Sequence, residues 1–279
     1  MNDAPLKPVE EGSAALSGAQ RERLVAPARR ERVFRFVSYF SPILILVFWE
    51  IASQSGLVDR RFIPPPTAIV DTAWKMIASG EIFVHVWATF QRVVVGYVMG
   101  GIPGLLVGLA LGMSTRLNRV LGPIFSALYP VPKIAILPLI LLFFGIGELS
   151  KYVVVAIGVF FLMFYNTLGG VRQTPQIYLD VARNAGASRF QTFARIAIPA
   201  ALPSIFTGLK LSAGTAYIVI AATEFLGSRS GVGFFIWASW QVFAVARMFV
   251  GIVTISLMGY LTLLSLDLIE RRLVPWARH

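Results

Sequence analysis

Long apolar runs, separated by shorter polar segments, follow one another along most of the sequence. A run of about 20 apolar residues forms a helix long enough to cross the roughly 30 Å hydrocarbon layer of a membrane. Backbone groups in lipid find partners only inside a helix or a closed β-barrel, and the period-two alternation of a barrel is missing. We therefore predict an all-α, polytopic membrane protein. Six transmembrane helices are expected, at 36–54, 93–113, 122–147, 152–171, 203–226 and 245–267.

Composition supports a membrane protein. The chain has 279 residues, of which 56% are hydrophobic and 14% charged, and its mean hydropathy is +0.72. That leaves too little polar surface to enclose a soluble core. Residues 1–35 are charged and lack an apolar period, which predicts a disordered tail before a transmembrane domain at 36–273 and a short tail at 274–279. The absence of cysteine excludes disulfides and thiolate metal sites.

The distribution of Lys and Arg predicts the orientation. Sixteen of the 25 basic residues fall in 1–35, 113–121, 171–201 and 267–279, and seven fall in the segments expected on the other side. By the positive-inside rule, both termini and the 171–201 segment are expected in the cytoplasm. The formal charge of +11 is accordingly attributed to topology and contact with anionic lipid, and not to nucleic acid.

Residues 174–203 form a polar segment between two apolar runs. Thr174 and Pro175 predict a helix start, with the Thr174 hydroxyl capping free amides, and this helix is expected to stop at Gly186. Ser188 and Gln191 fit a capping box that begins a second short helix. That helix is expected to end near Pro199, before Pro203 opens the next span. The alternative is an amphipathic connector that lies on lipid headgroups.

Glycine recurs every fourth residue in the second predicted span. Small residues at this spacing let two helix backbones approach closely, so the stripe is expected to pack on another helix of the bundle, with Pro103 adding a bend. The alternative is a helix that is glycine-rich for flexibility. The stripe consists of Gly96, Gly100, Gly104, Gly108 and Gly112.

Several motifs resemble one family of membrane proteins. Asp180, Val181, Ala182 and Gly186, followed by Ile196, Ile198 and Pro199, resemble the "EAA…G…I-LP" loop of permease subunits of bacterial ATP-binding-cassette (ABC) importers, with aspartate in place of the first glutamate. FIPPPT at 62–67, PVPK at 130–133, FGIGELSK at 144–151, GASR at 186–189 and PAALP at 199–203 are similar to the nitrate, sulfonate, taurine and bicarbonate branch.

The resemblance implies a homodimer in the bacterial inner membrane, bound to two cytoplasmic ATPase subunits and fed by an extracytoplasmic solute-binding protein. It implies a small anion as substrate, with an aliphatic sulfonate or taurine first and nitrate or bicarbonate next. No G-x-x-x-x-G-K-[ST] loop is present, so ATP and Mg²⁺ are expected on the partner subunits and no cofactor on this chain. The segment expected to couple to the ATPase comprises Asp180, Val181, Ala182, Arg183, Gly186, Ala187, Ser188 and Pro199.

Polar groups at membrane depth are candidates for the translocation path, because each is costly unless it faces protein or water. Lys133 and Lys210 are expected near the cytoplasmic ends of their spans, where a lysine can snorkel. Glu224 is expected to pair with Arg229 or Arg247. Prolines at 130, 132 and 138 are expected to break the third span. The candidates for the path are Pro132, Lys133, Asn166, Thr223 and Glu224.

Two other classes of function compete with this interpretation. An enzyme is poorly supported, because His85 and His279 are the only histidines and no catalytic motif is present. An ion-gradient-driven secondary transporter or channel is the stronger alternative, although it would favour coupling acids and inverted repeats that the sequence lacks.

Overall fold

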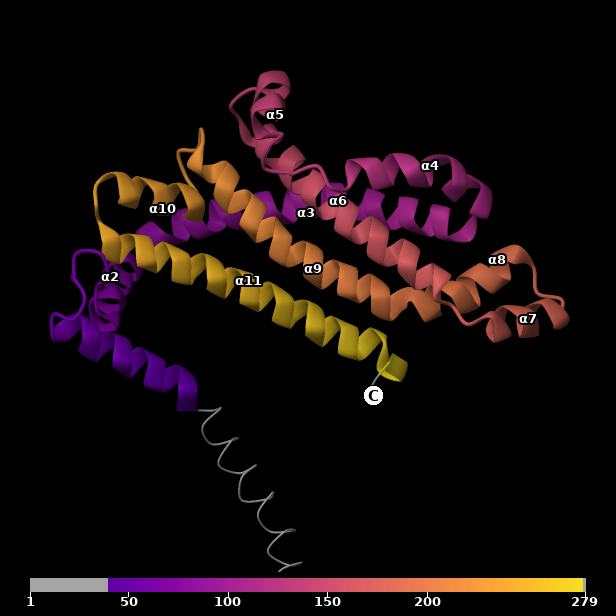
Figure 1. The fold of residues 1–279 in the computed structure, drawn as a ribbon, viewed down its shortest axis with the longest axis horizontal. Helices are drawn as coiled ribbons and strands as arrows, with labels where there is room; N and C mark the ends of the chain where they lie inside the picture. Colours follow the sequence, from indigo (N-terminus) through magenta and orange to yellow (C-terminus); the bar gives the residue numbers. More distant parts are fainter. Residues whose placement is uncertain (1–39, 278–279) are drawn as a thin grey trace, which may run out of the picture. The chain divides into compact units, whose positions relative to one another are not determined.

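Helices make up all the regular structure that the computed structural model describes, which covers residues 40–277 (Figure 1). The predicted all-α fold is confirmed. The chain divides after Thr67 into two units. The predicted tail at 1–35 lies outside the described residues.

The described part of the first unit contains the apolar helix Phe40–Gln54 and the loop that follows it. The Glu50 carboxylate accepts hydrogen bonds from the Thr67 amide at 3.1 Å and from the Thr67 hydroxyl at 2.8 Å. The Ser53 hydroxyl donates to the Ile63 carbonyl at 2.8 Å. These bonds hold the FIPPPT segment against the end of the helix.

The second unit contains most of α2, whose first two residues belong to the first unit, and the labelled helices from α3 to α11. Four stretches are long and apolar enough to cross a membrane: α3, α6, the continuous helical stretch Arg189–Phe225 and α11. A π-helical turn, Phe193–Ala197, joins α8 to α9 within that stretch. The helices are α2 (Pro66–Ala78), α3 (Glu81–Met113), α4 (Thr115–Leu128), α5 (Leu137–Phe144), α6 (Glu148–Arg172), α7 (Gln176–Asn184), α8 (Arg189–Thr192), α9 (Ile198–Phe225), α10 (Val232–Gln241) and α11 (Val245–Leu273).

The core of this unit is the packing of α3, α6 and α9 (Figure 1). α3 and α6 run parallel, since Gly96 lies at Val155 and Gly112 lies at Val171. α9 runs antiparallel to both, and α11 packs antiparallel on α9 through a hydrogen bond of 2.9 Å between the hydroxyls of Tyr217 and Thr262. The side chains of Val154, Val155, Val159, Phe164 and Ile220 are fully buried there.

The glycine stripe of α3 lies along its contact with α6. A Cβ atom at Gly104 would come within 2.6 Å of the Phe160 carbonyl oxygen, and one at Gly108 within 2.7 Å of the Thr167 Cβ. At Gly100 it would overlap the backbone carbonyl of Ala156. The two backbones therefore approach more closely than any side chain on these positions would permit.

The third predicted span, at 122–147, is interrupted as the prolines at 130 and 132 predicted, whereas Pro138 lies in the first turn of α5. The span consists of α4 and α5, separated by residues 129–136. Pro130 and Pro132 lack the amide hydrogens that a continuing helix needs, so α4 ends just before them. Tyr129 packs on Phe161, the fourteenth of the 25 residues of α6, which places the break level with the middle of that helix.

Two boundaries were predicted wrongly. α3 begins at Glu81 and not at Val93. The span was expected to start after the charged Arg92, but Arg92 lies inside the helix because Glu148 and Glu224 neutralise its charge. The second short helix does not end near Pro199, and Pro203 lies within α9, since the π-helical turn carries the backbone on from α8.

Two adjacent glycines give opposite predictions. Gly100→Ala should destabilise the protein by about 1–3 kcal/mol, because the new methyl group meets backbone that cannot move alone. Gly101→Ala is the matched control, because its Cβ would find Val159 and Met163 at 3.7 and 3.9 Å, which is ordinary contact. Thermal unfolding of the two purified variants in detergent compares them directly. Equal stability of the two variants would contradict the packing described here.

Candidate functional site

The segment expected to couple to an ATPase consists of α7, a glycine elbow and α8. α7 ends in a left-handed turn at Gly186, whose φ is 75°. The Ala187 amide donates to the Ala182 carbonyl at 2.9 Å, and the Gly186 amide donates to the Arg183 carbonyl at 3.0 Å. This pattern closes the helix and favours glycine at its end.

The second helix of the segment begins with a capping box. The Gln191 amide donates to the Ser188 hydroxyl at 3.2 Å, and the Ser188 amide donates to the Gln191 side-chain oxygen at 2.8 Å. The predicted capping box is confirmed. The predicted cap on α7 is wrong, because Pro175 occupies the N-cap position and the buried Thr174 hydroxyl makes no hydrogen bond.

α7 and α8 lie at one end of α9 (Figure 1). Both helices expose apolar side chains. Ala182 is buried and anchors α7, whereas Tyr178, Val181 and Phe190 are 54%, 60% and 74% exposed. Asp180 and Arg183 form an exposed ion pair of 2.9 Å. Pro199 lies in the first turn of α9.

An ionic cluster, here called the Arg92 cluster, lies at the opposite end of α9, with three of its four side chains buried and Glu148 49% exposed. It comprises Arg92, Glu148, Lys151 and Glu224. The Arg92 guanidinium donates two hydrogen bonds to Glu148, at 2.6 and 2.7 Å, and a third to Glu224 at 2.7 Å. Lys151 donates to Glu148 at 2.9 Å. Two cations and two carboxylates thus balance each other where α3, α6 and α9 meet.

Hydrogen bonds extend the Arg92 cluster into the loop before α10. The fully buried Glu224 carboxylate also accepts from the Thr89 hydroxyl at 2.9 Å and from the Gly233 amide at 2.8 Å. Arg92 donates to the Ser230 carbonyl at 2.6 Å. The cluster therefore fixes the 226–231 loop and the start of α10 against α3.

The predicted partners of Glu224 are wrong. It pairs with Arg92, and Arg247 instead pairs with Glu81. The second span was expected to begin at residue 93, so Arg92 was assigned to the preceding loop and its role as the partner of Glu224 was not predicted. The signal available was the spacing of Thr89 and Arg92, which puts two polar residues on one face of a helix that is otherwise apolar.

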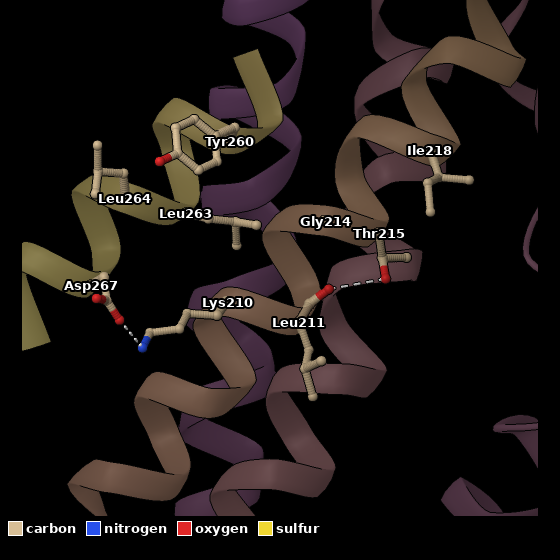
Figure 2. A pocket seen from close by; sticks show the side chains of 9 residues that line it. All are labelled: Lys210, Leu211, Gly214, Thr215, Ile218, Tyr260, Leu263, Leu264 and Asp267. Carbon is tan, nitrogen blue, oxygen red and sulfur yellow. Dashed lines mark hydrogen bonds and ion pairs between the residues drawn. The ribbon is translucent and has the colours of Figure 1, made fainter. Parts of the chain in front are cut away.

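Two grooves line the surface of α9. The larger, of about 720 Å³, lies between α9 and α11. Figure 2 shows Lys210 of α9 reaching towards Asp267 of α11, and their charged atoms are 2.5 Å apart. Lys210 also pairs with Glu270. This groove therefore carries no uncompensated lysine.

The second groove, of about 530 Å³, lies where the third span is broken. Its walls are residues 129–134, Gly158 and Phe161 of α6, and Thr215 and Val219 of α9. The Lys133 ammonium lies 5.0 Å from the ring centre of Tyr129 and 4.8 Å from that of Phe161. Lys133 is thus level with the middle of α6, and the expectation that it lies near an end of its span is wrong.

The other candidates for the translocation path lie elsewhere. Pro132 lines the second groove beside Lys133. Asn166 faces Gly208 of α9 and donates to the Leu162 carbonyl at 2.8 Å. Thr223 and Glu224 are buried among the helices and line neither groove. Within residues 40–277, no group of three His, Asp or Glu side chains could hold a metal ion.

Comparison with known proteins identifies the family. Residues 100–275 match the binding-protein-dependent transport system inner membrane components. The chain belongs to this family and is a multi-pass membrane permease of an ABC importer. The fold also matches a chain of the MetNI methionine ABC transporter solved in inward-facing conformations, with a TM-score of 0.61, 19% identity, and coverage of 70% of this chain and 98% of that one.

The relatives include permeases of the branch expected from the motifs, which confirms that resemblance. SsuC of Bacillus subtilis, named for aliphatic sulfonates transport, is 33% identical over 95% of this chain and 96% of its own length. The taurine transport system permease protein TauC of Escherichia coli is 30% identical, covering 84% and 86%. The nitrate import permease protein NrtB of Leptolyngbya laminosa is 34% identical, covering 90% and 91%.

The Arg92 cluster predicts a large effect of a single substitution. Arg92→Met should destabilise the protein by about 3–5 kcal/mol, because it leaves the buried Glu224 carboxylate without its cation. Lys75→Met is the control, since its ion pair with Asp71 is exposed and worth about 1 kcal/mol or less. Unfolding in detergent, followed by tryptophan fluorescence, measures both. A loss at Arg92 no larger than that at Lys75 would count against the cluster.

Proposed function

We propose that two copies of this chain together form the translocation path of an importer driven by ATP hydrolysis in two bound cytoplasmic ATPase subunits. A solute-binding protein on the other side of the membrane delivers the substrate. ATP and Mg²⁺ belong to the ATPase subunits. Family membership supports this assembly.

The continuity of α7, the Gly186 elbow, α8 and α9 is the observation that carries the mechanism. An ATPase that binds the exposed apolar surface at Tyr178, Val181 and Phe190 pushes on α7 and α8. Because the π-helical turn joins α8 to α9 without a loop, the displacement passes to α9. α9 lines both grooves, so its movement changes access to the path.

The proposed substrate is a small anion. An aliphatic sulfonate or taurine comes first, and nitrate or bicarbonate next. The names of the relatives, which refer to aliphatic sulfonates, taurine and nitrate, support an anion of this kind.

The elbow gives a test of coupling. Gly186→Val should reduce substrate-stimulated ATP hydrolysis by about tenfold, because a β-branched residue at positive φ is strained by about 1–2 kcal/mol and displaces α7 from α8. Gly80→Val is the matched control, with a φ of 79° and equally open surroundings, but it lies between α2 and α3. The assay is ATP hydrolysis by the reconstituted complex with its binding protein. Unchanged stimulation in Gly186→Val would remove the elbow from the coupling route.

The proposed topology places α7 and both termini in the cytoplasm and the 226–231 loop outside. The chain contains no cysteine, so single cysteines report position without further changes. In intact cells, a membrane-impermeant maleimide should label Arg229→Cys and leave Val181→Cys unlabelled until the membrane is opened. The reverse pattern would invert the orientation and exclude contact between α7 and a cytoplasmic ATPase.

A further inference from the structure

We propose that Lys133 forms a binding site for the transported anion at mid-depth in the membrane, in the groove at the break of the third span. This inference rests on the proposed function and deepens it, since it assigns the substrate contact and requires a substrate with negative charge. Tyr129 and Phe161 form the apolar wall of the site.

The first argument is the uncompensated charge of Lys133. Among the described residues, Lys133 forms no ion pair with a carboxylate. Its ammonium donates to the Tyr129 carbonyl and lies over two aromatic rings. Ring faces attract a cation but do not neutralise it. A lysine at this depth is costly unless it faces water or a counter-ion, and it then marks an ion or substrate pathway.

The second argument is the contrast between the two grooves. In the larger groove, Lys210 is paired with Asp267 (Figure 2). It is also paired with Glu270, so an anion would meet carboxylates as well as the ammonium. In the groove at the break, the lining side chains include one cation and no carboxylate. Charge complementarity therefore favours a small anion in the second groove and disfavours it in the first.

The third argument is the backbone around Lys133. Residues 129–136 are irregular, and non-helical backbone at membrane depth is tolerated where it is buried in protein or lines a water-filled cavity. Interrupted helices at the bilayer midplane are typical of substrate sites in transporters. The groove of about 530 Å³ has room for a partly hydrated anion such as a short alkanesulfonate.

The shape of the groove also indicates which anions fit. The ammonium of Lys133 meets the anionic head, and the rings of Tyr129 and Phe161 offer apolar surface beside it. A sulfonate with a short alkyl chain contacts both the ammonium and the rings, whereas nitrate contacts only the ammonium. Half-saturation by an alkanesulfonate is therefore expected at a lower concentration than half-saturation by nitrate.

The experiment uses the complete complex, with its ATPase subunits and binding protein, in proteoliposomes. Uptake of ethanesulfonate and of nitrate is measured for the wild type, Lys133→Met, Lys133→Arg and Lys75→Met. Lys133→Met should lower uptake of the transported anion by at least about tenfold, the scale of one charge-assisted contact. Lys133→Arg should retain most of the uptake, and Lys75→Met should match the wild type. All three variants should assemble with the ATPase subunits, and Lys75→Met should also keep the basal ATP hydrolysis of the wild type.

The outcomes separate this inference from the proposed function. Normal uptake by Lys133→Met, or equal losses in Lys133→Met and Lys133→Arg, would overturn the anion site and leave the importer intact. Wild-type complex that moves neither anion would overturn the substrate class proposed above, and the anion site with it. If Lys133→Met fails to assemble, Lys133→Gln takes its place. Failure of both to assemble would assign Lys133 a structural role and overturn the proposal.

Discussion

The close approach of α3 and α6 is the constraint on which the rest of the transmembrane unit depends. In lipid, helix association relies on van der Waals contact, so two backbones brought together by glycine form an unusually tight pair. Because α3 and α6 run parallel, the chain between them must recross the membrane. The irregular backbone falls in that connection, at residues 129–136, and not in the packed pair. The close parallel packing of α3 and α6 therefore accounts both for the rigid core and for the position of the groove at the break.

α9 links the features that bear on transport. Through Glu224 it joins the Arg92 cluster at one end, and through the π-helical turn it continues into α8 at the other. Both grooves include side chains of α9. The cluster fixes one end of α9 to α3 and α6, so relative motion of this helix is expected to be greatest at the end that carries α7 and α8. That arrangement suits a helix that transmits a displacement applied at one side of the membrane.

The sequence was most informative where a local rule decides the structure. Hydropathy identified α6 and α11 within a few residues, and the capping box at Ser188 follows from two side chains three positions apart. The sequence was least informative where contacts between residues far apart in the chain determine the structure. Arg92 looked like a loop residue because its two carboxylate partners come from other helices. The depth of Lys133 was misjudged because it depends on where α4 ends along α6, which hydropathy does not encode.

The π-helical turn Phe193–Ala197 has a geometric consequence for the direction in which α7 and α8 point. Such a turn accommodates one more residue than the α-helical ladder would hold. Each residue of an α-helix advances the azimuth by roughly 100°. The direction in which α8 points about the axis of α9 therefore depends on the number of residues in the turn, and not on which side chains these residues carry. A single insertion or deletion in this turn would therefore rotate the surface formed by α7 and α8 by roughly 100° without altering the packed helices.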